Sequence, residues 1–182
     1  MSRFDDVDLT DWYHDGAHFC VARGLMNGMS ATTFEPGTNT SRAMLVTMLY
    51  RMEGQPSIEN MTEPFTDVAP GDWFYASIVW AYNNGVVKGM SDTTFEPDTL
   101  VTREQVATIM HRYNGSPAGT GNLSGFPDVA RVSGYAVDAM VWAVGEGMIN
   151  GIAQGNGTSL LAPTGNATRA QIATILMRYL IA

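Results

Sequence analysis

The sequence predicts a mainly α-helical fold of three tandem helix-loop-helix repeats that form a pseudo-threefold bundle. The first observation behind this prediction is an internal repeat, because a Phe-x-Asp-Val-like opening recurs every 61 residues, at Phe4, Phe65 and Phe126. A period of this length is typical of a repeat architecture. The second observation is an apolar stripe at helical spacing that occurs once in each copy.

The first predicted helix of each repeat follows an aromatic residue and ends at a glycine. It is clearest over residues 75–84, which follow Trp73 and precede Gly85. A glycine just past the last helical residue is a common helix stop, because it adopts the left-handed conformation without strain. Gly24 and Gly147 are the equivalents in the other copies. We therefore expect this helix three times.

The second predicted helix begins at a Ser or Thr that is followed by an arginine. Ser and Thr are good N-caps, and a Gln three residues later completes a capping box in the second and third copies. Apolar residues then follow at i, i+3, i+4 and i+7, which predicts one buried stripe. These residues are Leu45, Met48, Leu49 and Met52; Val106, Ile109, Met110 and Tyr113; and Ile172, Ile175, Leu176 and Tyr179. Three such stripes can converge on one centre, as the predicted bundle requires.

These signals divide the chain into three repeats and two linkers. The repeats are expected at residues 1–54, 65–115 and 126–182. The linkers, 55–64 and 116–125, are rich in Gly, Pro, Ser and Asn, which is typical of surface connections.

Composition excludes several classes of function. The chain has 182 residues, of which 45% are hydrophobic, so it can form a real core. Its net charge of -8 argues against binding to nucleic acid or to anionic lipid, because both need a basic surface. No apolar run of about 18 residues is present, so no membrane insertion is predicted. No basic-then-apolar leader precedes Phe4, so we expect that any leader was removed or that the chain is an excised piece.

The arginine after each N-cap is the main candidate for ligand binding. A cation in the first turn faces the positive end of the helix dipole, which costs a few tenths to about 1 kcal/mol. Arg42, Arg103 and Arg169 nevertheless share this position in all three copies. We therefore expect an anion to meet them, either an external ligand or a carboxylate of the same fold. The candidate carboxylates are Asp6, Asp67 and Asp128.

A second set of arginines lies nine residues further on, near the helix C-termini. These are Arg51, Arg112 and Arg178. A cation at that end complements the helix dipole, so we expect these three to be structural.

A glycine-rich loop joins the two helices of each repeat. Its second glycine is Gly28, Gly89 or Gly151. The loop continues through Phe-Glu-Pro in the first two copies, whereas the third is four residues longer and has lost the Phe and the Glu. The third copy therefore departs most from the shared loop pattern.

Together these features resemble the S-layer homology (SLH) domain. The resemblance rests on the Phe-x-Asp-Val openings, the Gly-x-x-x-Gly pairs, the Phe-x-Pro loops and the Thr-Arg-Ala-Glu-like helix starts, and it extends from Phe4 to Leu180. It implies a three-pronged spindle with ligand grooves between neighbouring prongs. The lost Phe and Glu and the four-residue insertion make the third copy's groove the least secure of the three. It also implies non-catalytic anchoring to bacterial secondary cell-wall polysaccharide, often through a pyruvylated N-acetylmannosamine. The expected location is extracellular, at the cell wall or S-layer, as part of a larger surface protein.

The same resemblance implies the ligand contacts. They are the helix-start arginine, the glycine-loop backbone, the opening aspartate and the aromatic residue. In this chain the aromatic is Trp12, Trp73 or Tyr135, which could supply a flat face to a sugar ring or could instead be a core wedge between repeats. Arg103, beside free N–H groups at a helix N-terminus, could bind the carboxylate of a pyruvate ketal. Three grooves on one polymer would raise the apparent affinity.

Two other classes of function are the alternatives. One is a structural module for lattice or partner assembly that contacts no glycan. The other is an enzyme acting on the glycan, for which Glu35 and Glu96 are the possible carboxylates, although Ala162 fills the third equivalent position. No nucleophile-base pair is evident, so we predict no catalytic residue.

His14 and His18 have the i, i+4 spacing of metal ligands, but their counterparts in the second copy are Tyr75 and Val79, so we predict no metal site. No cofactor is expected either.

Overall fold

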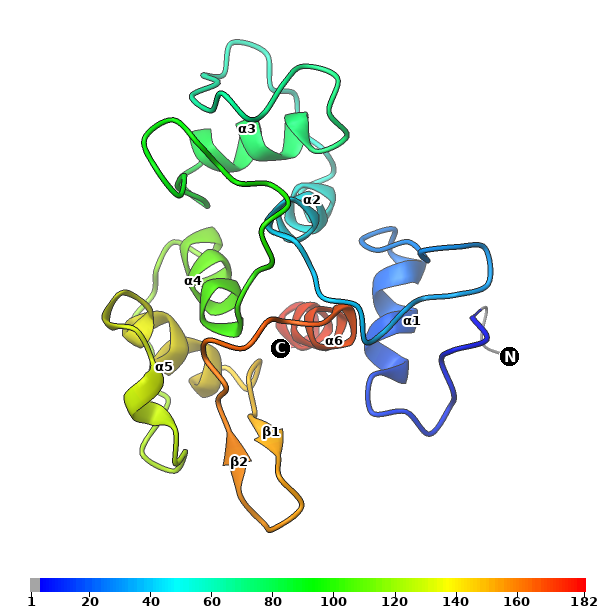
Figure 1. The fold of residues 1–182 in the computed structure, drawn as a ribbon, viewed down its shortest axis with the longest axis vertical. Coiled ribbons are helices and arrows are strands. Elements are labelled where there is room, and N and C mark those ends of the chain that lie inside the picture. The colour runs from blue at the N-terminus through cyan, green and yellow to red at the C-terminus, as the bar shows by residue number, and fades with distance from the viewer. Residues whose placement is uncertain (1–3) are drawn as a thin grey trace.

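A computed structural model describes residues 4–182 and shows a mainly α-helical fold (Figure 1). The first three residues of the predicted first repeat lie outside the described residues. The helices are α1 (His14–Ala22), α2 (Arg42–Met52), α3 (Tyr75–Asn83), α4 (Arg103–Tyr113), α5 (Val137–Gly145) and α6 (Arg169–Ile181). Two 3-10 turns, η1 (Val129–Arg131) and η2 (Gly134–Ala136), precede α5. The strands β1 (Ile152–Ala153) and β2 (Ser159–Leu160) pair antiparallel, with Ile152 opposite Leu160.

Local sequence signals determine where the helices begin and end. Thr102 and Thr168 form complete capping boxes at the starts of α4 and α6, as predicted. Ser41 caps α2 by accepting a hydrogen bond from the Met44 N–H at 3.3 Å. Gly85 follows α3 in the left-handed conformation, with φ of 71°. The predicted stop signals are therefore confirmed for this helix.

Each helix pair combines two different repeats. The first helix α3 packs against α2 of the preceding repeat, and α5 packs against α4 in the same way. The first helix of the chain, α1, packs against the last, α6. In Figure 1, α2, α4 and α6 surround the middle of the molecule, and α1, α3 and α5 lie outside them on three arms. Within residues 4–182, each helix of a repeat therefore packs mainly against a helix of another repeat.

Three backbone segments meet in a closed ring at the start of the inner helices. The N–H of Thr40 donates to the carbonyl of Ala167, that of Ala167 to Val101, and that of Val101 back to Thr40, each at 2.9 Å. Each segment lies just before the helix of its own repeat. The ring therefore joins all three repeats through main-chain hydrogen bonds.

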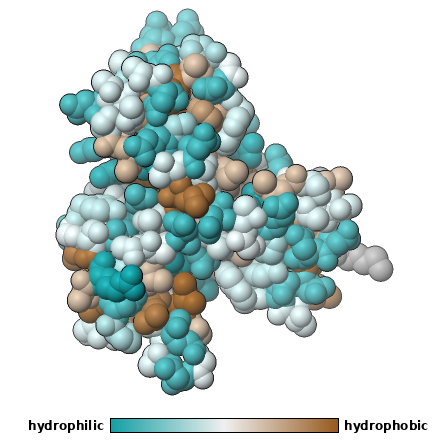
Figure 2. Space-filling view, in the orientation of Figure 1, coloured by the Kyte–Doolittle hydropathy of each residue, from teal (hydrophilic) through white to brown (hydrophobic). Residues whose placement is uncertain are grey.

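The core follows the predicted apolar stripes. Their first three residues in every copy are buried, as are Trp80 and Trp142 of the outer helices. Cys20 is also buried, and its burial raises the pKa of the thiol to about 12. The face in Figure 2 is mostly hydrophilic or neutral, and its hydrophobic residues form small separate groups. None of the helices within residues 4–182 is long and apolar enough to cross a membrane.

Candidate ligand-binding grooves

The three helix-start arginines cross the boundary between repeats. Each is buried, with 4–5% of its surface exposed, and its Nε donates to a loop carbonyl of the next repeat in cyclic order. These bonds join Arg42 to Phe95 at 3.0 Å, Arg103 to Leu161 at 2.8 Å and Arg169 to Phe34 at 2.8 Å. In this way the unfavourable first-turn cation connects two repeats.

The opening aspartates bind the same loops through backbone N–H groups. Asp67 accepts hydrogen bonds from the N–H groups of Phe95 at 2.9 Å and Glu96 at 2.7 Å. Asp6 and Asp128 accept the equivalent pairs, from Phe34 and Glu35 and from Leu161 and Ala162. In the described part of the chain no ion pair joins these aspartates to the three arginines. The ion-pair alternative from the sequence is therefore wrong.

The expectation of free N–H groups beside Arg103 is also wrong. The N–H of Arg103 donates to Gly165 at 2.9 Å, and that of Glu104 donates to Pro163 at 3.0 Å. The next N–H, that of Gln105, is taken by the cap residue Thr102. Carbonyl groups of a neighbouring repeat thus occupy the helix start, so an anion at this point can be met only by the guanidinium.

Burial lowers the pKa of all three helix-start arginines below its ordinary value. A nearby carboxylate opposes each shift: Glu96 for Arg42, Asp128 for Arg103 and Glu35 for Arg169. An aromatic ring adds a cation–π contact in two cases. The Cζ atom of Arg42 lies 4.4 Å from the ring centre of Phe95, and that of Arg169 lies 4.6 Å from the ring centre of Phe34. Arginine remains protonated under these conditions because its pKa is so high.

The three aromatic residues lie on the surface. Trp12 is 64% exposed, Trp73 is 60% exposed and Tyr135 is 58% exposed. The alternative of core wedges is therefore wrong. Tyr135 differs from the tryptophans because its hydroxyl donates to the buried Glu104 at 3.1 Å. Burial and this hydrogen bond raise the pKa of Tyr135 to about 12.

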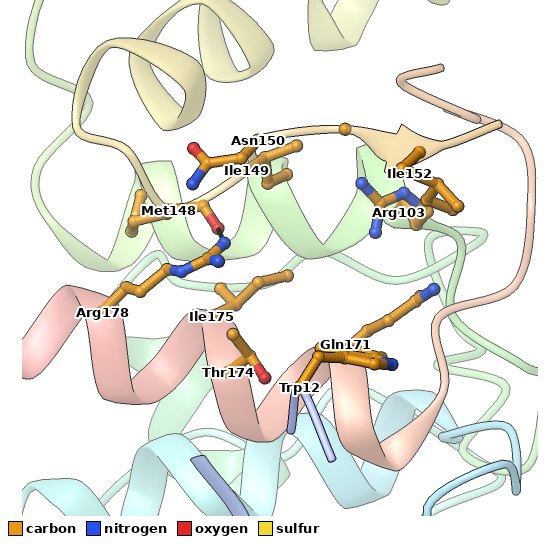
Figure 3. A pocket seen from close by; sticks show the side chains of 12 residues that line it. Trp12, Arg103, Met148, Ile149, Asn150, Ile152, Gln171, Thr174, Ile175 and Arg178 are labelled. Atoms are coloured by element: carbon orange, nitrogen blue, oxygen red, sulfur yellow. Dashed lines mark hydrogen bonds between the residues drawn. The ribbon is translucent and has the colours of Figure 1, made fainter. Parts of the chain in front are cut away.

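Two cavities lie at equivalent places between repeats, and we call them the first and third grooves. The first groove measures about 150 Å³, and its lining includes Gly28, Thr47, Met48, Arg51, Trp73 and Arg169. The third groove measures about 480 Å³, and its equivalent residues are Gly151, Thr174, Ile175, Arg178, Trp12 and Arg103 (Figure 3). Each groove thus combines the loop and inner helix of one repeat, the arginine of the preceding repeat and the aromatic of the next.

Sequence reasoning assigned one set of groove residues to a purely structural role. Arg51 and Arg178 line the grooves and also donate to loop carbonyls, those of Leu25 at 3.1 Å and Met148 at 3.2 Å. A helical signal could have found them, because Gln171, Thr174, Ile175 and Arg178 follow i, i+3, i+4, i+7 spacing beside the core stripe.

The loop glycines are needed because the opening phenylalanine packs against them. A Cβ atom on Gly89 would lie 2.6 Å from Cε1 of Phe65, and one on Gly28 would lie 2.5 Å from Cε1 of Phe4. At Gly151 the distance to Phe126 would be 2.8 Å. These glycines therefore hold the loop shape, and Gly28 and Gly151 also line the two grooves.

The chain matches known proteins along most of its length. The family model of the S-layer homology domain matches residues 3–43, 64–107 and 125–173. The chain belongs to this family. The three matched segments confirm the three tandem SLH repeats that the sequence resembles.

Several relatives contain the same SLH segment within much longer proteins. The chain is 29% identical to an amylopullulanase of Thermoanaerobacterium thermosulfurigenes over 95% of its own length and 9% of the relative. It is 30% identical to a surface-layer 125 kDa protein of Lysinibacillus sphaericus, over 93% of the chain and 14% of the relative. With the S-layer protein sap of Bacillus anthracis it shares 29% identity, over 63% of the chain and 15% of the relative.

The family and two of these relatives indicate where the module is located. The SLH family and the surface-layer relatives indicate a cell-wall anchoring module that is associated with the cell surface. The chain spans less than a fifth of the length of these relatives, and the match to the amylopullulanase covers only its SLH region.

Proposed function

We propose that this SLH module binds secondary cell-wall polysaccharide non-covalently, through an acidic, pyruvylated sugar held in its inter-repeat grooves. The observation that carries this proposal is the third groove, where two arginines and an exposed tryptophan line one cavity. Its volume of about 480 Å³ is within the usual range for a small-molecule site.

Each wall of the groove suits one part of such a ligand. The guanidinium of Arg103 offers planar donors that match a carboxylate, the charged group of a pyruvate ketal. The indole of Trp12 offers a flat apolar face to a sugar ring. Ile175 supplies apolar surface on α6, and Thr174 and Gln171 lie beside it (Figure 3). An acidic saccharide would therefore find charge, stacking and polar contacts together.

The other predicted site residues support the ligand contacts. In this proposal Asp6, Asp67 and Asp128 act by fixing the loops, because their carboxylates accept the loop N–H groups. Gly28, Gly89 and Gly151 act by allowing the loops to approach the opening phenylalanines. Arg42, Arg169, Trp73 and Tyr135 would contribute to the other two grooves.

The relatives support anchoring as the role of the shared segment. An amylopullulanase and a surface-layer protein have different activities, yet both contain a segment like this chain. Because the two proteins differ in activity, the segment they share would serve a task separate from either activity, which in this proposal is anchoring. Glu35 and Glu96, the carboxylates considered for an enzyme, accept hydrogen bonds from Thr38 and Thr99 in separate repeats, both at 3.0 Å. They do not form a pair.

Co-sedimentation with purified cell-wall polymer tests the proposal. Because the helix-start arginines connect repeats, replacing them would damage the fold, so the test variant replaces the exposed Trp12, Trp73 and Tyr135 with Ala. The wild type should sediment with the polymer, and the triple variant should remain largely in solution. The exposed Leu9→Ala variant is the control and should bind as the wild type does.

The polymer itself provides the second control. Removal of the pyruvate ketal should abolish co-sedimentation of the wild type. If the wild type stays in solution with intact polymer, the module serves assembly without glycan contact. Release of reducing sugar from the polymer would instead reveal an enzyme.

A further inference from the structure

We infer that the third groove is the main ligand site of this chain, and that Arg103 and Arg178 form its anion-binding pair. The inference rests on the proposed function and goes beyond it, because the three copies need not bind equally. The sequence-based expectation ranked the third copy's groove as the least secure, whereas the structure gives it the larger of the two cavities described above.

The hydrogen bonds of the three helix-start arginines distinguish the copies. Arg42 donates from Nη2 to the carbonyl of Lys88 at 3.1 Å, and Arg169 donates from Nη2 to that of Asn27 at 2.6 Å. Arg103 makes only its Nε bond, so its two terminal nitrogens have no hydrogen-bond partner within residues 4–182. A ligand can therefore bind Arg103 without breaking an existing contact.

The longer third loop explains why Arg103 is different. Its extra residues form the β1–β2 hairpin, and Gly151 at the start of the hairpin has φ of 80°. Gly28 and Gly89 lie outside that left-handed region. Within residues 4–182 the carbonyl of Asn150, the equivalent of Asn27, consequently accepts no hydrogen bond from Arg103. Leu161 replaces the phenylalanine of the other loops, so the ring that contacts Arg42 and Arg169 has no counterpart at Arg103.

The third groove also has the charge to select an anion. Arg103 and Arg178 lie on different walls of the cavity, and no Asp or Glu is among its lining residues (Figure 3). Arg178 uses Nη1 for the carbonyl of Met148, which leaves its other donors for a ligand. In a chain of net charge -8, this cavity has a locally positive lining, and Asp128, the carboxylate near Arg103, is not part of it. An acidic sugar unit would bring a negative charge into direct contact with the two arginines.

Tyr135, the aromatic that the third copy contributes to the groove of the second copy, is already engaged. Tyr135 donates to Glu104, which also accepts from the N–H and the hydroxyl of Ser133 at 3.0 and 2.7 Å. Ala43 and Ala170 occupy the position of Glu104 in the other copies, so this link forms only between the second copy and the third. By contrast, Trp12 at the third groove makes no hydrogen bond to a side chain or backbone group of residues 4–182 that a ligand would have to displace.

Two matched pairs of variants test the inference. Trp12→Ala and Trp73→Ala remove equivalent tryptophans of similar exposure, from the third and first grooves. Arg178→Gln and Arg51→Gln remove equivalent arginines, each of which donates to one loop carbonyl. The probe is the monosaccharide N-acetylmannosamine carrying a pyruvate ketal, and its affinity is measured by isothermal titration calorimetry. Circular dichroism checks that each variant is folded.

Trp12→Ala and Arg178→Gln should each weaken binding about tenfold or more, because each removes a contact worth about 1.4 kcal/mol or more. Trp73→Ala and Arg51→Gln should weaken only the weaker binding in the first groove and change the affinity of the tighter site in the third groove less than about twofold. Ligand should also change the fluorescence of the wild type, and Trp12→Ala should lose most of that change. N-acetylmannosamine without the ketal should not bind.

The possible failures are distinguishable. If the wild type binds the probe and both members of each pair weaken binding equally, the grooves are equivalent and the inference is wrong, while the proposed function stands. If the first-groove variants have the larger effect, the inference is also wrong. If the wild type binds neither the probe nor the polymer, the proposed function fails, and the inference fails with it.

Discussion

Arg42 and Asp67 bind the two polar backbone groups of the same residue, Phe95. Arg42 donates to its carbonyl at 3.0 Å, and Asp67 accepts from its N–H at 2.9 Å. The arginine comes from the first repeat and the aspartate from the second. The loop that contains Phe95 is therefore held by two repeats at once, and the most distinctive polar residues of the sequence meet at one residue, on the two peptide units that flank its Cα.

The first prediction concerns the aspartate in this arrangement. Asp67→Asn replaces a carboxylate whose two oxygens accept two N–H groups with an amide that has only one oxygen, so either the part-buried N–H of Phe95 or the exposed N–H of Glu96 loses its partner. We expect the free energy of unfolding to fall by about 1–3 kcal/mol, as measured by urea denaturation. Asp98→Asn, at an exposed position in the same loop region, should change it by less than about 0.5 kcal/mol. Equal midpoints for the two variants would contradict this role.

The second prediction concerns the loop glycine. A Cβ on Gly89 would meet the Phe65 ring at 2.6 Å and the carbonyl of Thr94 at 2.6 Å. Gly89→Ala should therefore lower the free energy of unfolding by about 1–3 kcal/mol, the usual cost of overpacking. Gly37→Ala is the matched control, because a Cβ there meets no atom within 4 Å. Urea midpoints compare the two, and an unchanged midpoint for Gly89→Ala would show that the loop can move away.

The third prediction concerns the dependence of each repeat on its neighbours. A chain that ends at residue 125 lacks α6, the packing partner of α1, and α5, the partner of α4. It also lacks Ala167, so the backbone ring cannot close. We expect this fragment to lose cooperative thermal unfolding in circular dichroism.

The full chain provides the reference for that experiment, and it should unfold in one cooperative transition. A full chain with a shortened hairpin tip, within the exposed residues 154–158, should keep this transition because no inner helix is affected. A sharp transition and native helix content in the fragment would show that the repeats fold independently.

The fourth prediction concerns pH. The pKa of Tyr135 is raised to about 12, first by burial and then by its hydrogen bond to Glu104. Since its ordinary value is 10.0, the folded state favours the protonated phenol. Its contribution to stability should be complete below about pH 10 and lost as the pH rises towards 12. The chemical shift of the Tyr135 ring carbon bearing the hydroxyl, followed against pH by NMR, measures this pKa.

A substitution separates the two causes. Glu104→Gln removes the charged acceptor and leaves the burial, so the pKa of Tyr135 should fall part of the way towards 10.0. Tyr135→Phe assigns the signal by its disappearance. An unchanged pKa in Glu104→Gln would mean that the hydrogen bond does not contribute.

The local parts of this fold could be predicted from the sequence because their signals are local. Gly85 stops α3 and Thr102 caps α4 through residues within one helical turn. The pairing of helices could not be predicted in the same way. The stripes on α2, α4 and α6 are chemically alike, so nothing in the sequence of α3 distinguishes its partner α2 from α4.

The candidate site was predictable only in outline. The sequence identifies Arg103 as unusual, but the groups that bind it belong to a distant loop at Leu161. The N–H groups beside it are used by Pro163 and Gly165, which the chain brings there only after all three repeats have assembled. The sign of φ at Gly151, which separates Arg103 from its counterparts, is likewise a property of the folded hairpin.

The packing of α1 against α6 has a mechanical consequence for a surface anchor. Arg169, at the start of α6, bonds the carbonyls of Phe34 and Asn27, both in the first repeat. A pull on α6 would therefore load the first repeat as directly as the third. Because helix packing and hydrogen bonds join the first repeat to the last, tension would be distributed over all three repeats rather than passed from one repeat to the next.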